Sequence, residues 1–128
     1  MYGFHAKVSC GFDEAVEKVT EELQKEGFGI LTEIDVKATL KKKLDIDKRP
    51  YLILGACNPP LANRALEADS DIGLLLPCNV VVREEEDGSI TVAFMDPAAV
   101  LGLVNKEEVT QLGTEVREKL QNVCKALA

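Results

Sequence analysis

Residues 51–60 read YLILGACNPP and lie near the middle of this 128-residue chain. The first six are apolar, which predicts a central β-strand over 51–56. Asn58 and Pro59 then form a strong helix start, because Asn is a preferred N-cap and Pro is favoured at the first helical position. The segment therefore predicts an interior strand that leads almost directly into a helix over 59–68.

A second stretch, GLLLPCNVVV over residues 73–82, repeats part of this pattern. Each stretch joins a strand-like apolar run to a Cys-Asn pair, Cys57-Asn58 in one and Cys78-Asn79 in the other. A thiol and a carboxamide in this position, found twice, predict a shared polar site. We expect the two apolar strands to be neighbours in the sheet, with Cys57 and Cys78 close together.

Hydrophobic periodicity places further elements on both sides of these two. A strand is expected over 2–9, an amphipathic helix from Phe12 to Leu23, and a short helix over 37–44. The alternation over 29–36 predicts a strand with Ile30, Ile34 and Val36 on one side.

The second half of the chain predicts a hairpin and a long helix. The run over 72–85 is interpreted as strand, with Pro77 marking a bulge or an edge position. Asp87-Gly88 predicts a hairpin turn before a return strand that ends at Asp96-Pro97. Asn105 with Glu108 forms a capping-box start for a C-terminal helix whose apolar stripe runs to Leu127.

The predicted order of elements is β-α-β-α-β-α-β-β-α. This order, in one domain over 1–128, predicts an α+β fold with a single, mostly antiparallel sheet backed by helices. The chain is 46% hydrophobic, which is ordinary for a globular domain.

Charge and hydropathy exclude several classes of protein. The net charge of −7 lacks the basic footprint of a duplex nucleic-acid binder. No run of 18 apolar residues predicts a membrane span, and the first ten residues lack the regions of a signal peptide. We therefore expect a cytoplasmic protein whose four cysteines are reduced. None of them forms a C-x-x-C motif.

Three segments, GFGILTEIDVKATL, GACNPPLANRAL and IGLLLPCNVVV, together resemble the family known as domain of unknown function 302. The resemblance covers nearly the whole chain. It implies a small α+β protein with a sheet backed by helices and a tendency to form dimers, and it implies no substrate. The residues to which it draws attention are Cys57, Asn58, Pro59, Pro77, Cys78 and Asn79.

Each residue of the two Cys-Asn pairs has a structural and a functional interpretation. Cys57 precedes a helix N-terminus that would lower its pKa, but free Cys is also a common core residue. Cys78 is either a core residue, or a bulge at Pro77 turns its side chain toward a site. Asn58 is most simply a helix cap. Asn79 lies where a strand is expected, and Asn is depleted in strands, so it needs a hydrogen-bond partner or a ligand.

A soft metal on Cys57 and Cys78, with Met95 or His5 as a third ligand, is a weaker alternative. These ligands are scattered in the sequence, so we predict no metal and no cofactor. The common nucleotide-binding and hydrolase motifs are absent from the sequence.

The segment from Lys37 to Arg49 holds six basic and two acidic residues, a net charge of +4 in an acidic chain. It is either a solvated helix face or a docking site for an acidic partner. The acidic residues 84–87 keep a hairpin soluble, or pair with this basic segment across a dimer.

Three functions remain open from the sequence. The first is a non-catalytic, homodimeric protein that binds a small molecule at Cys57, Asn58, Cys78 and Asn79. The second is a thiol-dependent enzyme or redox protein that uses Cys57. The third is a protein-interaction module that uses the basic segment from Lys37 to Arg49.

Overall fold

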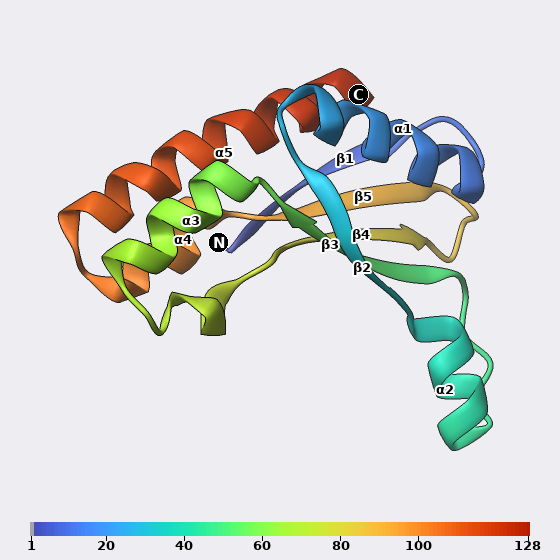
Figure 1. Cartoon of the computed structure of the whole chain (residues 1–128). Helices are drawn as coiled ribbons and strands as arrows, with labels where there is room; N and C mark the ends of the chain where they lie inside the picture. The colour runs from blue at the N-terminus through green and yellow to red at the C-terminus, as the bar shows by residue number, and fades with distance from the viewer. Residues whose placement is uncertain (1) are drawn as a thin grey trace.

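The computed structural model describes residues 2–128 as one five-stranded sheet with helices on one side (Figure 1). The strand order is β1-β5-β4-β3-β2, and every neighbouring pair is antiparallel. The predicted α+β fold is confirmed. The strands are β1 (Gly3–Val8), β2 (Gly29–Asp35), β3 (Tyr51–Cys57), β4 (Cys78–Glu84) and β5 (Ile90–Met95).

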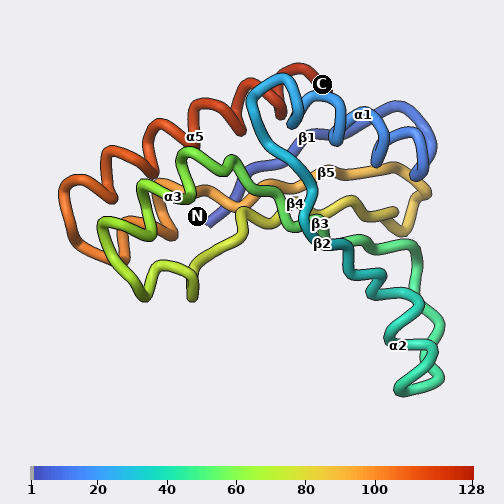
Figure 2. Tube along the Cα trace, in the orientation of Figure 1, coloured from blue at the N-terminus to red at the C-terminus, as the bar shows by residue number. Residues whose placement is uncertain are grey.

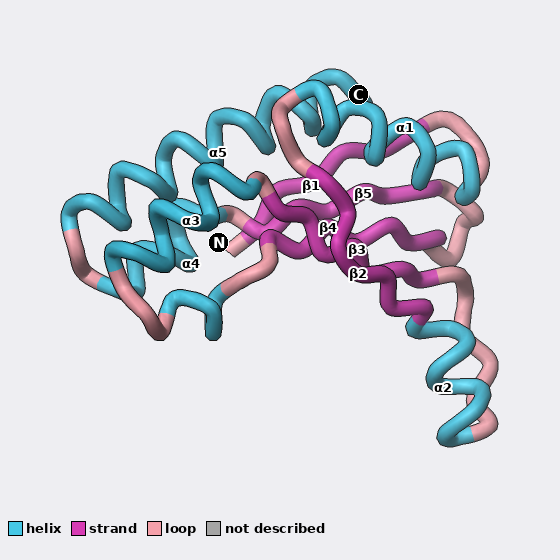
Figure 3. Tube along the Cα trace, viewed as in Figure 1, coloured by secondary structure: helices cyan, strands magenta, loops and turns pink. Residues whose placement is uncertain are grey.

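The helices α1 (Phe12–Lys25) and α5 (Glu107–Leu127) cover one face of the sheet. Beside α5, at one end of the sheet, lie α3 (Pro59–Ala68) and the short α4 (Pro97–Leu101) (Figure 3). The helix α2 (Val36–Leu44) projects away from the rest, past the opposite end of the sheet (Figure 2). No helix within residues 2–128 combines the length and the hydrophobicity that crossing a bilayer requires.

The core lies between the sheet and the two long helices. Alternate residues of β3, β4 and β5 point toward the helices, as the period of two in a strand requires. The strands contribute Leu54, Ala56, Val80, Val82, Val92 and Phe94, and the helices contribute Val19, Leu23, Leu120 and Val123. The face of the sheet away from the helices, which we call the open face, has no layer over it in residues 2–128.

Asn58 joins the end of α1 to the start of α3. Its Oδ1 accepts a hydrogen bond from the backbone N–H of Leu61 at 3.4 Å, which confirms the predicted N-cap. Its Nδ2 donates to the carbonyl oxygen of Glu26 at 3.2 Å. The next residue, Gly27, has φ of +86°, and a Cβ there would lie 2.9 Å from Nδ2 of Asn58. Glycine is therefore the residue that fits this junction.

The interpretation of residues 72–85 as strand is wrong in its first half. Ile72–Leu75 forms a 3-10 turn, and β4 begins only at Cys78. Pro77 therefore precedes a strand rather than interrupting one, and β4 is the central strand of the sheet. A proline is tolerated just before a strand because its missing N–H is not needed by the ladder there.

The sheet has its irregularity in β2 instead. The register with β3 shifts between Ile30 and Thr32, so that Ile30 lies opposite Ala56 and Ile34 opposite Ile53. The prediction that Ile30 and Ile34 share a face is wrong, because one extra residue at a bulge reverses the alternation. Ile30 packs on the core, and Ile34 is 49% exposed.

The predicted start of the last helix is also wrong. Asn105 has φ of +58° and ends a 3-10 turn, and the N-cap of α5 is Lys106, whose side chain makes no capping hydrogen bond. The helix α4 was not predicted. Its N-cap is Asp96, whose Oδ1 accepts from the N–H of Ala98 at 3.0 Å.

The Asn58→Ala variant should lower the free energy of unfolding by about 1–2 kcal/mol, because it removes a helix cap and leaves the Glu26 carbonyl oxygen without its side-chain donor. Urea unfolding followed by circular dichroism measures the change. The matched control is Asn63→Ala on the exposed side of the same helix, which should change stability by less than about 0.5 kcal/mol. Equal stabilities for the two variants would contradict this account of Asn58.

Candidate functional site

A pocket of about 360 Å³ lies where β3 ends and β4 begins. We call it the end pocket. Cys57 and Cys78 contribute to its lining from the two strands. Phe28, just before β2, and Leu31, near the start of β2, contribute as well. The remaining wall comes from α3, α4, α5 and the segment before β4, through residues that include Leu61, Ala65, Leu76, Leu101, Leu112 and Val116.

The end pocket is almost entirely apolar. Thr32 and Asn58 are the only side chains with nitrogen or oxygen atoms among its lining residues in the described part of the chain, and none of the lining residues is charged. Both ends of the Asn58 carboxamide already make hydrogen bonds to backbone groups. The pocket therefore offers a ligand mainly apolar contact and two thiols.

The antiparallel pairing of β3 with β4 places Ala56 opposite Cys78, so Cys57 lies one residue beyond that pair. The prediction that the two cysteine-bearing strands are neighbours is confirmed. Cys57 is partly buried, and Cys78 is only 6% exposed. Among residues 2–128 all four cysteines are free thiols.

Burial raises the pKa of the Cys78 thiol to about 11, and the proximity of Cys57 contributes a smaller further rise. Cys78 is therefore a neutral thiol at physiological pH. Because the thiolate is the nucleophilic form, Cys78 is unsuited to nucleophilic chemistry. Cys57 is the more exposed of the two cysteine residues in this pocket.

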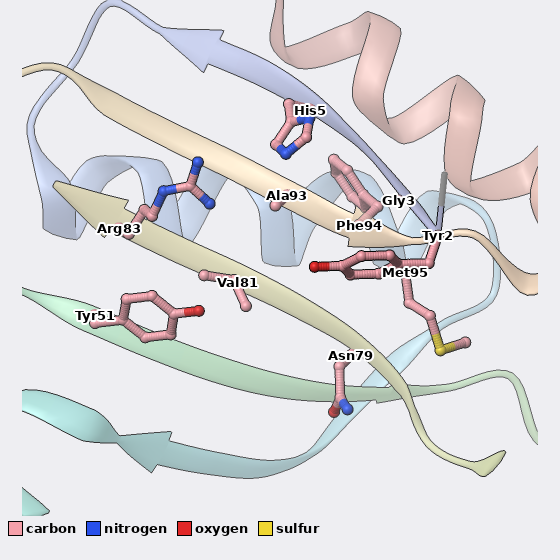
Figure 4. Close-up of a pocket in the computed structure, with 10 residues that line it drawn as sticks. All are labelled: Tyr2, Gly3, His5, Tyr51, Asn79, Val81, Arg83, Ala93, Phe94 and Met95. Carbon is pink, nitrogen blue, oxygen red and sulfur yellow. The ribbon is translucent and has the colours of Figure 1, made fainter. Parts of the chain in front are cut away.

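Asn79 lies outside the end pocket. It follows the core-facing Cys78 in β4, and successive side chains of a strand point to opposite faces. Its side chain lies in a groove of about 410 Å³ on the open face (Figure 4). The structure thus brings three of the four candidate residues, Cys57, Asn58 and Cys78, to one pocket and places Asn79 at another.

The groove on the open face is more polar than the end pocket. His5, Tyr51 and Arg83 stand around it, over a floor that includes Val81 and Ala93 (Figure 4). The Nε of Arg83 pairs with the carboxylate of Glu85 at 2.8 Å, and the hydrogen bond from Arg83 lowers the pKa of that carboxyl group.

The geometry does not bring His5 or Met95 to Cys57 and Cys78 as a third ligand for a soft metal. His5 and Met95 line the groove on the open face, whereas Cys57 and Cys78 line the end pocket. Within residues 2–128, His, Cys, Asp and Glu side chains form no group of three or more that is arranged to hold a metal ion.

The basic segment forms an exposed arm rather than part of either pocket. Lys41 pairs with Asp45 at 2.8 Å and Asp47 at 3.2 Å within the segment itself. Arg49 lies 3.8 Å from Glu86 of the β4–β5 hairpin, and both side chains are exposed. Exposed pairs of this kind contribute little to stability, so they leave the segment available for other contacts.

Sequence reasoning did not identify the helical walls of the end pocket. Leu61, Leu112 and Val116 lie on the apolar stripes of α3 and α5, where they look like ordinary core positions. No sequence signal separates an apolar residue that fills a core from one that lines a cavity, because both follow the same helical period.

The family model described as "Domain of unknown function DUF302" matches residues 4–127. The chain belongs to the DUF302 family. A crystal structure of an uncharacterized conserved DUF302 protein from Bacillus stearothermophilus is similar, with 29% sequence identity and a TM-score of 0.93. The similarity covers 100% of this chain and 99% of that one. No curated protein matches the chain.

In the folded DUF302 protein, iodoacetamide at pH 8 should label Cys57 at least ten times faster than Cys78. With a pKa of about 11, only about one Cys78 thiol in a thousand is ionised at that pH, and burial also blocks the reagent. Mass spectrometry of digests taken over time measures both rates. Unfolding in urea, which should make both cysteines reactive, is the control, and similar rates in the folded protein would contradict the prediction.

Proposed function

We propose that this DUF302 protein binds a small, uncharged, largely apolar molecule in the end pocket. The observation that carries the proposal is the composition of the lining, in which apolar side chains from three helices surround two thiols without a charged group. Concave, mostly apolar surface with few polar groups is the usual character of a small-molecule site. A charged ligand would lose its hydration there without gaining a partner.

Binding is favoured over catalysis by the same lining. The described residues around the end pocket include no His, Asp, Glu, Lys or Arg, so Cys57 has no neighbouring side chain there to act as a general base. A cysteine is activated by such a base, by a nearby positive charge or by a helix N-terminus, and of these only the N-terminus of α3 lies beside Cys57. The two thiols then serve as polarizable contacts for the ligand.

We also propose that the protein is cytoplasmic and works as a homodimer. The four free cysteines suit a reducing compartment. The edge strand β2 leaves most of its residues exposed, and the unpaired edge of a small sheet is commonly covered by association. Pairing of two copies supplies that cover.

The Ala62→Phe variant should weaken ligand binding at least tenfold, because Ala62 lines the end pocket from α3 and a phenyl group there would occupy it. The probe is N-phenyl-1-naphthylamine, an uncharged apolar dye whose fluorescence rises in apolar surroundings. We expect the wild-type protein to bind one dye per chain, in competition with other uncharged apolar molecules.

The matched control is Ala126→Phe at an exposed position of α5, which adds the same side chain away from both pockets. It should bind the dye like the wild type. No saturable binding by the wild-type protein, or equal binding by both variants, would overturn the proposed site.

A further inference from the structure

The groove on the open face has a polar end and an apolar floor. Arg83 of β4 and Tyr51 of β3 are paired in register at the polar end. Val81 and Ala93, which are paired in register on β4 and β5, lie on the floor, and His5 of β1 stands beside Ala93 (Figure 4). The solvated face of an antiparallel sheet normally carries polar residues, so this apolar floor is better suited to contact with a ligand.

The face is hollowed because small residues lie between large ones. Ala93 carries only a methyl group near the centre of the face, and Gly3, one row along the sheet, carries no side chain. The longer side chains of His5, Tyr51 and Met95 stand around them (Figure 4). The resulting volume of about 410 Å³ is within the range of about 300–1,000 Å³ that is usual for small-molecule sites.

Arg83 gives the groove a fixed positive charge, and no Asp or Glu lines the groove within residues 2–128. Its Nε donates to the carboxylate of Glu85 at 2.8 Å, which holds the guanidinium in place. No hydrogen bond within the same residues uses its two terminal amino groups, so they are available to a ligand. Parallel N–H groups of a guanidinium match the two oxygen atoms of a carboxylate.

Thr91 and Asn79 add polar groups at the two ends of the groove. Thr91 lies two residues from Ala93 on β5 and therefore shares its face, in register with Arg83. It is only 3% exposed, and its Oγ1 has no hydrogen-bond partner in the described part of the chain, which is uncommon for a buried polar atom. Asn79 lines the groove with a carboxamide that both donates and accepts.

We infer that this groove binds a small monocarboxylate with a flat, apolar body. The carboxylate pairs with the terminal amino groups of Arg83 and accepts from the phenol of Tyr51, and the body lies on Val81 and Ala93. A single carboxylate is favoured over a phosphate dianion because one guanidinium faces the groove and Glu85 already pairs with it. The groove shares no lining residue with the end pocket, so it is a second site for a different class of ligand.

An NMR titration of the full chain, labelled with nitrogen-15, tests the inference. The ligand is 2-naphthoate, and 2-naphthamide, which has the same shape without the charge, is its matched control. The backbone amides of Val81 and Ala93 report on the groove, and those of Leu61 and Ala65 report on the end pocket. In the wild type, 2-naphthoate should saturate the groove with an affinity at least ten times higher than that of 2-naphthamide there.

Two variants test the residues that carry the inference. Arg83→Gln should weaken 2-naphthoate binding in the groove at least tenfold because it removes the charge, and Ala93→Leu should do the same because it fills the floor. The matched control is Arg64→Gln, which removes another arginine that pairs with a glutamate, Glu115, at 3.1 Å but lies outside the groove. This control should bind 2-naphthoate like the wild type.

Three results would overturn the inference. They are no saturable binding of 2-naphthoate in the groove, equal affinities of the groove for 2-naphthoate and 2-naphthamide, and equal binding by Arg83→Gln and Arg64→Gln. The first two need no variant. Tighter binding of phenyl phosphate than of benzoate in the groove would overturn the choice of a carboxylate.

The same titrations separate this inference from the ligand proposed for the end pocket. Arg83→Gln should bind N-phenyl-1-naphthylamine within twofold of the wild type, because Arg83 does not line the end pocket. Loss of dye binding with 2-naphthoate still bound in the groove would overturn only the end-pocket proposal. Shifts from 2-naphthoate that are confined to the end pocket would overturn both.

Discussion

The antiparallel pairing of β3 with β4 is the constraint on which the rest of the structure depends. With Ala56 opposite Cys78, the apolar residues of both strands face the helices together, and the two strand ends meet beside α3. A slip of one residue would reverse every side chain of a strand. It would turn Cys78 toward solvent and Asn79 into the core. Both the core and the end pocket therefore exist only in this register.

The end pocket forms at the end of the sheet where β3 ends and β4 begins, because helices pack around this point. Asn58 turns the chain straight from β3 into α3, and its second hydrogen bond holds α1 against that turn. α4 packs closely on α5 near Gly113, where a Cβ would lie 3.0 Å from the carbonyl oxygen of Pro97. The helices thus close around the strand ends without filling the space between them.

Much of the fold was predictable because its strongest signals are local. The apolar run of β3, the Asn58-Pro59 helix start and the stripe of α5 all appear in the sequence as they do in the structure. The helix α4 carries the same cap and proline signal at Asp96-Pro97, but five residues are too few to show a helical period. The bulge in β2 leaves no composition signature, so the reversal of Ile34 to the open face was not predictable.

The candidate site was predictable only in part, because only some of its residues carry a local sequence signal. The repeated Cys-Asn pair led to Cys57, Asn58 and Cys78, which the structure brings to one pocket. The two asparagines differ because Asn58 lies beyond the end of its strand, whereas Asn79 lies within one and so faces away from its neighbour Cys78. The helical walls depend on tertiary packing, which no local pattern encodes.

The most direct test of the ligand-binding account is a crystal structure of the protein purified from its native host without denaturation, combined with native mass spectrometry of the same sample. The account predicts a bound, uncharged apolar molecule whose electron density lies in the end pocket against Cys57 and Cys78. A charged ligand in that pocket, or a native ligand that occupies only the groove on the open face, would contradict it.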